Sequence, residues 1–127
     1  MLRTLGMGIV RTYQDLEVWQ TSIELAVDIT RLANQLPQSE LYALGLQLRR
    51  AAISVPSNIA EGYGRSTRPE YVRFLRIARG SNAEVSSLLI IATRLGYLSE
   101  ARAARTRETN DRIAAMLTRL LQTLEGR

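Results

Sequence analysis

Apolar residues recur at spacings of three and four along most of the chain, and this periodicity predicts amphipathic helices. The three prolines and eight glycines divide the chain into four such segments. We predict helices over about residues 15–36, 39–62, 67–95 and 99–124. The sequence therefore predicts an all-α fold.

The first predicted helix is opened by Asp15, a residue that can cap a helix, and is closed by Pro37. It carries two apolar stripes, so two of its faces favour burial. One stripe comprises Leu16, Trp19, Ile23, Ala26 and Ala33, and the other comprises Val18, Leu25, Ile29, Leu32 and Leu36.

The second predicted helix carries a row of apolar residues at heptad-like spacing, and this row favours the core. The row comprises Leu41, Leu44, Leu48, Ala51, Val55 and Ile59. A second apolar face comprises Tyr42, Leu46, Ile53 and Ala60. Pro56 removes a backbone donor inside the helix, so we expect a kink near residues 52–56.

The third and fourth helices have clear start and stop signals. Thr67 and Glu70 have the spacing of a capping box, with Pro69 between them. Gly96 is typical of the residue that ends a helix, and Ser99 can cap the next one. The start of the fourth helix should be looser, because polar Thr106 and Asn110 occupy its apolar row, which continues as Ile113, Leu117, Leu120 and Leu124.

Four helices with short connections favour an antiparallel up-down-up-down bundle over residues 13–127, with a three-helix fold as the main alternative. Residues 1–12 are expected to form a poorly ordered tail. The first three helices each carry more apolar surface than one core stripe requires, so a monomer would expose a sizeable apolar patch. We therefore predict a homo-oligomer.

Composition narrows the possible chemistry. The chain of 127 residues has neither Cys nor His, which excludes disulfides, Cys or Ser-His nucleophiles and histidine proton transfer, and argues against zinc and di-iron sites. We expect no enzyme activity, cofactor or metal. No apolar run reaches bilayer length and the N-terminal stretch does not resemble a signal peptide, so we expect a cytoplasmic protein without a membrane partner.

Charge gives the best functional candidate. All 17 basic residues are Arg, against 12 acidic residues, for a net charge of +5. Such a surface attracts phosphates or an acidic partner, and tyrosines among the arginines can stack unpaired bases. The candidate interface for RNA or single-stranded DNA comprises Arg49, Arg65, Arg68, Arg73, Arg76, Tyr63 and Tyr71. The alternative is a solvated face with salt bridges inside an oligomer interface.

A polar stripe on the second helix, together with polar residues of the third, favours a structural network that fixes helix register. It comprises Gln47, Arg50, Ser54, Asn58, Glu61, Arg79, Ser81 and Glu84. A carboxylate pair of Glu61 and Glu84 working as a hydrolase is the competing interpretation. The segment from Gly62 to Ser66 lacks the Lys-Ser/Thr ending of a P-loop, so its glycines favour a tight helix reversal.

Three blocks resemble a known family: DLEVWQ at 15–20, QLRRAAISVPSNIAEGYGR at 47–65 and FLRIARGSNAE at 74–84. They are similar to the four-helix-bundle proteins encoded within intervening sequences of bacterial 23S ribosomal RNA genes. The resemblance covers about residues 13–98 and implies a ring-like homopentamer with no established enzymatic activity. The fold is more distantly similar to the accessory variability determinant of diversity-generating retroelements, a basic pentameric bundle that engages nucleic acid.

Two functions follow from these observations. The first is a non-enzymatic oligomer, pentameric by resemblance, that binds RNA or single-stranded DNA through phosphates without sequence specificity. The second is a protein-interaction scaffold, in which the basic residues serve assembly or a protein partner.

Overall fold

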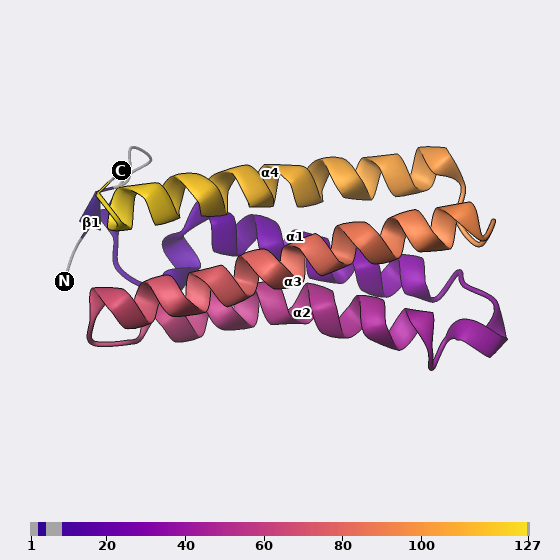
Figure 1. Cartoon of the computed structure of the whole chain (residues 1–127), viewed down its shortest axis with the longest axis horizontal. Helices are drawn as coiled ribbons and strands as arrows, with labels where there is room; N and C mark the ends of the chain where they lie inside the picture. The colour runs from indigo at the N-terminus through magenta and orange to yellow at the C-terminus, as the bar shows by residue number, and fades with distance from the viewer. Residues whose placement is uncertain (1–2, 5–8, 127) are drawn as a thin grey trace.

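A computed structural model of the chain describes residues 3–4 and 9–126, with side chains described from residue 9 onward (Figure 1). Within these residues there are four α-helices: α1 (Glu17–Ala33), α2 (Leu44–Tyr63), α3 (Arg68–Arg94) and α4 (Glu100–Leu124). Two-residue strands β1 (Arg3–Thr4) and β2 (Ile9–Val10) pair antiparallel. The predicted all-α class with four helices is confirmed.

The four helices lie lengthwise beside one another, and the described part of the chain begins and ends at the same end of the molecule (Figure 1). The main contacts join α1 to α2, α2 to α3, α3 to α4 and α4 back to α1. The core between them contains fully buried Leu25, Leu48, Leu75 and Leu117, one from each helix. Burying each such side chain stabilises the fold by about 1.5–3 kcal/mol.

Local capping signals set the ends of α3 and the start of α4, as predicted. The Thr67 hydroxyl accepts a hydrogen bond from the Glu70 N–H at 3.3 Å, and Ser99 accepts one from the Arg102 N–H at 3.1 Å. Gly96 has φ +79°, and the Tyr97 N–H returns to the Ala92 carbonyl at 3.0 Å. This closing pattern satisfies carbonyls that the end of α3 leaves unpaired.

The predicted start of the first helix at residue 15 needs a correction. Asp15 accepts hydrogen bonds from the Arg11 and Thr12 N–H groups at 2.9 and 3.1 Å. It therefore belongs to the short 3₁₀ helix η1 (Tyr13–Asp15), and α1 begins two residues later at Glu17. At its other end α1 stops at Ala33 rather than residue 36.

The second helix begins at Leu44, five residues later than predicted, because the intervening chain turns twice. Residues after Pro37 form the 3₁₀ helix η2 (Gln38–Glu40), and Ala43 has φ −113° and ψ −95°, outside the helical region. From Leu44 the helix continues through buried Pro56 to Tyr63. The expected kink at Pro56 stays a prediction.

The N-terminal segment has more structure than the sequence indicated at residues 9–12. Val10 lies in the hydrophobic core with 4% of its surface exposed, and Thr12 caps η1. The remainder of the predicted tail includes residues 1–2 and 5–8, which lie outside the described residues. In the described part of the chain, each helix is too short or too polar to cross a bilayer.

Candidate functional site

The end of α2, the following turn and the start of α3 form one end of the bundle. Gly62 allows this end to close tightly, because a Cβ at that position would lie 2.7 Å from the Phe74 Cβ. It would also lie 3.2 Å from the Tyr71 Cδ1. The close approach brings Arg65 of the turn beside Arg73 of α3, since both lie over the Phe74 ring.

Two of the predicted arginines are held by glutamates one turn away. The Arg65 Nη2 lies 2.8 Å from the Glu61 Oε1, and the Arg73 Nε lies 2.9 Å from the Glu70 Oε2. The hydrogen bond from Arg73 lowers the pKa of the Glu70 carboxyl and raises the pKa of the Arg73 guanidinium. The Glu70 side chain therefore pairs with Arg73, whereas the sequence predicted that it would complete a capping box with Thr67.

The same two arginines cover the ring of Phe74. The guanidinium carbons of Arg65 and Arg73 lie 4.7 and 4.5 Å from the ring centroid. Phe74 is only 7% exposed, so its ring is part of the packed end of the bundle. Both arginine side chains stay accessible, at 42% and 56% exposure.

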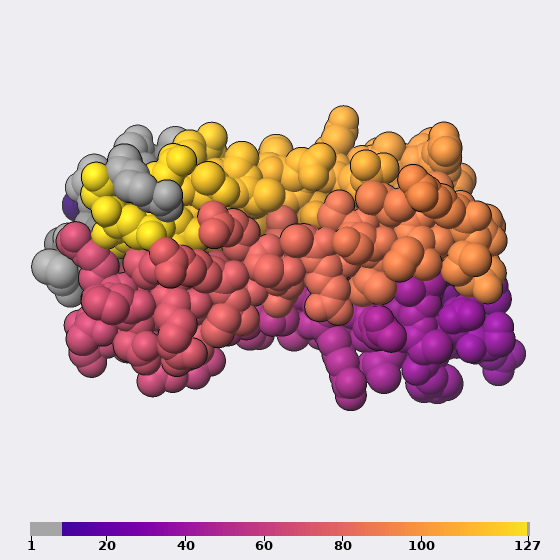
Figure 2. Space-filling view, viewed as in Figure 1, coloured from indigo at the N-terminus to yellow at the C-terminus, as the bar shows by residue number. Residues whose placement is uncertain are grey.

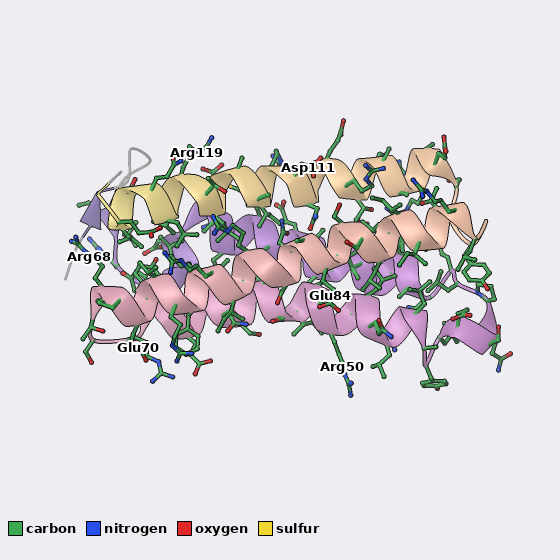
Figure 3. All side chains as sticks on the ribbon, in the orientation of Figure 1. Arg50, Arg68, Glu70, Glu84, Asp111 and Arg119 are labelled. Carbon is green, nitrogen blue, oxygen red and sulfur yellow. The ribbon has the colours of Figure 1, made fainter. Side chains whose placement is uncertain are left out.

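The other predicted arginines are distributed over different surfaces. Arg76 pairs with Glu125, just beyond α4, so this side of α3 faces α4. Arg68 is exposed at the end of the bundle and has no ion pair with any residue from 9 to 126 (Figure 3). Arg49 is half-buried and donates to the Leu41 carbonyl at 3.3 Å, away from the α2–α3 turn.

The two predicted base-stacking tyrosines contact each other edge-on, with ring centroids 6.0 Å apart. Tyr71 is 3% exposed, so its ring belongs to the core and is not available to a base in this conformation. Tyr63 is half-buried. The structure therefore removes Tyr71 from the candidate interface.

The predicted polar network is smaller than expected. The Ser54 and Ser81 hydroxyl oxygens lie 2.9 Å apart, and the Asn58 amide donates to the Ser54 hydroxyl at 2.9 Å. Arg79 is half-buried and outside these hydrogen bonds. The remaining members are exposed, and Arg50 extends away from the bundle (Figure 3): Gln47, Arg50, Glu61 and Glu84.

The predicted carboxylate pair is not assembled. Ser54 contacts Ser81, whereas Gly62, later in α2, faces Phe74, earlier in α3. Glu61 and Glu84 thus lie on opposite sides of the serine contact, about 15 Å apart along the helices at 1.5 Å per residue. Among residues 9–126 there is also no cluster of three acidic side chains that could hold a metal ion.

Comparison with known proteins identifies the family. A family model described as 23S rRNA-intervening sequence protein matches residues 14–119. The chain belongs to this family. The resemblance drawn from the three sequence blocks is thereby confirmed. The blocks end at residue 84, in α3, whereas the match continues to residue 119, in α4.

A crystal structure at 1.70 Å resolution has a similar fold. It is of a protein of unknown function from the S23 ribosomal protein family of Bacteroides thetaiotaomicron VPI-5482. The TM-score is 0.78 at 23% sequence identity, and the match covers 83% of this chain and 98% of the other. At that identity the likeness shows the fold alone. No curated protein matches the chain.

In this family member, sequence reasoning missed a buried asparagine pair between α3 and α4. The Asn82 amide donates to the Asn110 carbonyl at 2.9 Å, and the Asn110 amide donates to the Asn82 carbonyl at 3.0 Å. Each side-chain oxygen is buried without a hydrogen-bond partner among the described residues. The available signal was Asn110 itself, a polar residue in an apolar row.

A second missed contact ties α1 to α4. The Asp28 carboxylate accepts from the Arg102 Nη2 at 2.6 Å and from the Thr106 hydroxyl at 2.7 Å. Burial opposes ionisation of Asp28, but these two hydrogen bonds outweigh it and lower the pKa of the carboxyl. Of the two polar residues in the apolar row of α4, Thr106 therefore bonds to α1 and Asn110 bonds to α3.

The chain also exposes large apolar side chains, both on α1, α2 and α3 and in segments outside these helices. Among residues 9–126 these are Ile9, Ile23, Val27, Tyr42, Ile53, Ile77, Ile91 and Leu95. Ile77 and Ile91 on α3 and Leu95 just after it lie on one edge with Ser81, which contacts α2. Figure 2 shows α3 and α4 side by side along the length of one face of the molecule.

Proposed function

We propose that this chain is a non-enzymatic, homo-oligomeric, up-down-up-down helical bundle that binds RNA or single-stranded DNA through phosphates, without sequence specificity. The distribution of charge carries the proposal. Residues 49–79 contain seven arginines and two glutamates, a net of +5 that equals the net charge of the whole chain. Phosphates are drawn to such a concentration of guanidinium groups.

The phosphate contacts are assigned to Arg68, Arg76 and Arg79. Positions 68 and 79 lie within about 80° of position 76 around α3, at 3.6 residues per turn, so all three share the side that faces α4. Arg68 and Arg79 have no ion pair within the described residues. The Arg76 pair with Glu125 leaves the Arg76 side chain 56% exposed, and such ion pairs contribute little to stability, so a phosphate can replace the glutamate.

Self-association is supported by the exposed apolar side chains, since a monomer leaves them in water. Charge favours a head-to-tail contact between copies. Residues 15–40 contain five acidic residues and one arginine, a net of −4, against the net of +5 at residues 49–79. A symmetric contact through the basic segment would oppose like charges, whereas head-to-tail contacts pair opposite charges and close rings. The resemblance to the family implies that such a ring has five copies of the chain.

Fluorescence anisotropy with labelled single-stranded RNA, single-stranded DNA and duplex DNA tests the binding. Two or three copies of the chain together offer about six to nine such phosphate contacts, so binding of a single strand should weaken about 300-fold or more between about 50 and 200 mM salt. The double substitution Arg68→Glu and Arg76→Glu should abolish binding. Arg105→Glu with Arg112→Glu is the matched control, because both arginines are exposed on α4 and the charge change is the same. Equal loss in both variants would refute the assignment to α3.

Light scattering at micromolar concentration tests the assembly. A particle of 14.2 kDa, the mass of one chain, would refute the oligomer.

The scaffold function is the second candidate, and one observation favours it. Arg65, Arg73 and Arg76 already have carboxylate partners within the chain. These three charges are then used within the chain, and the exposed surface is available to a protein partner. Absence of nucleic-acid binding at 50 mM salt would favour this function over the first.

A further inference from the structure

Arg65 and Arg73 differ from the other arginines of the basic segment in how their donors are used. The Arg65 Nη2 donates to the Glu61 Oε1 at 2.8 Å, and the Arg73 Nε donates to the Glu70 Oε2 at 2.9 Å. Each also lies over the same Phe74 ring, within 5 Å of its centroid. The two side chains come from different elements, Arg65 from the turn after α2 and Arg73 from α3.

This arrangement suits phosphate less well than that of Arg76, because among the described residues Arg65 and Arg73 each have a ring contact as well as a glutamate, whereas Arg76 has the glutamate alone. A phosphate binds the N–H edge of a guanidinium, and at both arginines a glutamate already occupies part of that edge. The flat faces of the group are a separate surface. Each guanidinium carbon lies within 5 Å of the Phe74 ring centroid, and the side chains are still 42% and 56% exposed, so part of each group stays accessible to a second flat ring.

The carboxylates and the ring also hold the two guanidiniums in place before any ligand binds. Ordering a long side chain on binding costs conformational entropy, so an arginine that is already fixed loses less when a ring stacks on it. Unpaired bases in single strands stack on guanidinium planes as well as on aromatic rings. Bases inside a duplex are stacked on one another and do not offer their faces.

We infer that Arg65 and Arg73, backed by Phe74, form a stacking site for unpaired bases beside the phosphate contacts on α3. The inference rests on the proposed function, and it names the ligand of this end of the bundle as a single strand rather than a duplex. The Arg65 and Arg73 site takes the base-stacking role that the sequence assigned to Tyr71, which is buried.

The test compares an oligodeoxyadenylate of twelve nucleotides with an abasic strand of the same length, which keeps the phosphates and lacks the bases. Wild-type protein should bind the strand with bases at least about fivefold more tightly, the lower end of one stacked base. The double substitution Arg65→Lys and Arg73→Lys keeps both charges and removes both planar groups. It should bind the two strands equally, with an unchanged dependence on salt.

Arg105→Lys with Arg112→Lys is the matched control, because both arginines are exposed on α4 outside the proposed contacts, and it should keep the preference for bases. Each lysine substitution is also made singly, and circular dichroism verifies the fold of every variant. Wild-type protein that binds both strands equally would overturn the stacking site and leave phosphate binding intact. A base preference that survives in the Arg65 and Arg73 variant would also overturn the assignment. Wild-type protein that binds neither strand at 50 mM salt would overturn this inference together with the proposed function.

Discussion

Alanine substitution at two helical glycines should change stability in opposite directions. In an open helical position, Gly→Ala stabilises by roughly 0.5–1 kcal/mol, because glycine loses more backbone freedom on folding. Gly80 in α3 is such a position, since a Cβ there has no atom within 4 Å. We expect Gly80→Ala to stabilise the protein by that amount.

Gly62 has no such space. Its Cβ would lie 2.7 Å from the Phe74 Cβ and 3.3 Å from the Tyr71 carbonyl oxygen, whereas carbon atoms pack best at about 3.5–4.0 Å. Both contacting atoms are on or next to the α3 backbone, so the clash is relieved only by moving α3 away from α2. Overpacking of this kind costs about 1–3 kcal/mol, which exceeds the gain in helix propensity. We expect Gly62→Ala to destabilise the protein by about 1–2 kcal/mol.

Urea and thermal unfolding of both variants measure this difference. For a chain of this size, 1 kcal/mol corresponds to a shift of about 4 °C in Tm, so the two variants should unfold roughly 6–12 °C apart. All samples are compared at one protein concentration, because association stabilises the native state. A Gly62→Ala protein as stable as Gly80→Ala would refute the close packing of α2 on α3.

Three further predictions concern the contacts between helices and between copies. The lowered pKa of Asp28 means that its contribution to stability is present above its ordinary value of 3.8 and is lost as the pH falls below 3.8, through the lowered pKa of the folded protein. Asp28→Asn should remove this part of the acid dependence of the urea midpoint, and an unchanged dependence would contradict the hydrogen bonds assigned to Asp28. Asn110→Ala should destabilise by about 1–3 kcal/mol in urea unfolding, because it breaks a buried reciprocal pair. A loss below about 0.5 kcal/mol, half the usual value of one hydrogen bond, would argue against that pair. Ile77→Glu with Ile91→Glu should reduce the mass measured by light scattering, whereas Arg105→Glu on α4 should leave it unchanged; the reverse result would place the contact between copies on α4.

The elements that the sequence predicted best are those whose ends depend on local chemistry. Thr67, Ser99 and Gly96 each act on backbone groups a few residues away, so their effect is visible in the sequence. The start of α2 depends instead on a 3₁₀ turn and on Ala43, whose non-helical backbone no residue type in the segment signals. Tertiary packing decides such boundaries, and a single sequence carries little information about it.

The candidate site shows the same division. Sequence spacing was enough to bring Arg65 and Arg73 together at one end of the bundle, because the turn after α2 is short and α3 follows at once. It was not enough to predict all of the carboxylates with which the arginines pair. Glu61 and Glu70 lie at helical spacing from Arg65 and Arg73, so these two pairs were predictable. The pair between Arg76 and Glu125 joins residues far apart in the chain and requires the fold.

The periodicity of α3 contained more information than the first interpretation used. Tyr71 heads a row at spacings of four and three that continues through Leu75, Ala78, Asn82, Val85, Leu89 and Ala92, and every member is buried. Read as a member of this row, Tyr71 is a core residue and Asn82 is a buried polar one. A second row at the same spacings runs through Ile77, Ser81, Glu84, Leu88, Ile91 and Leu95. It is only partly covered by α2, because its isoleucines and Leu95 stay exposed. One helix with two such rows has more apolar surface than a single bundle core can cover, and this excess is the physical basis for expecting a second copy of the chain at α3.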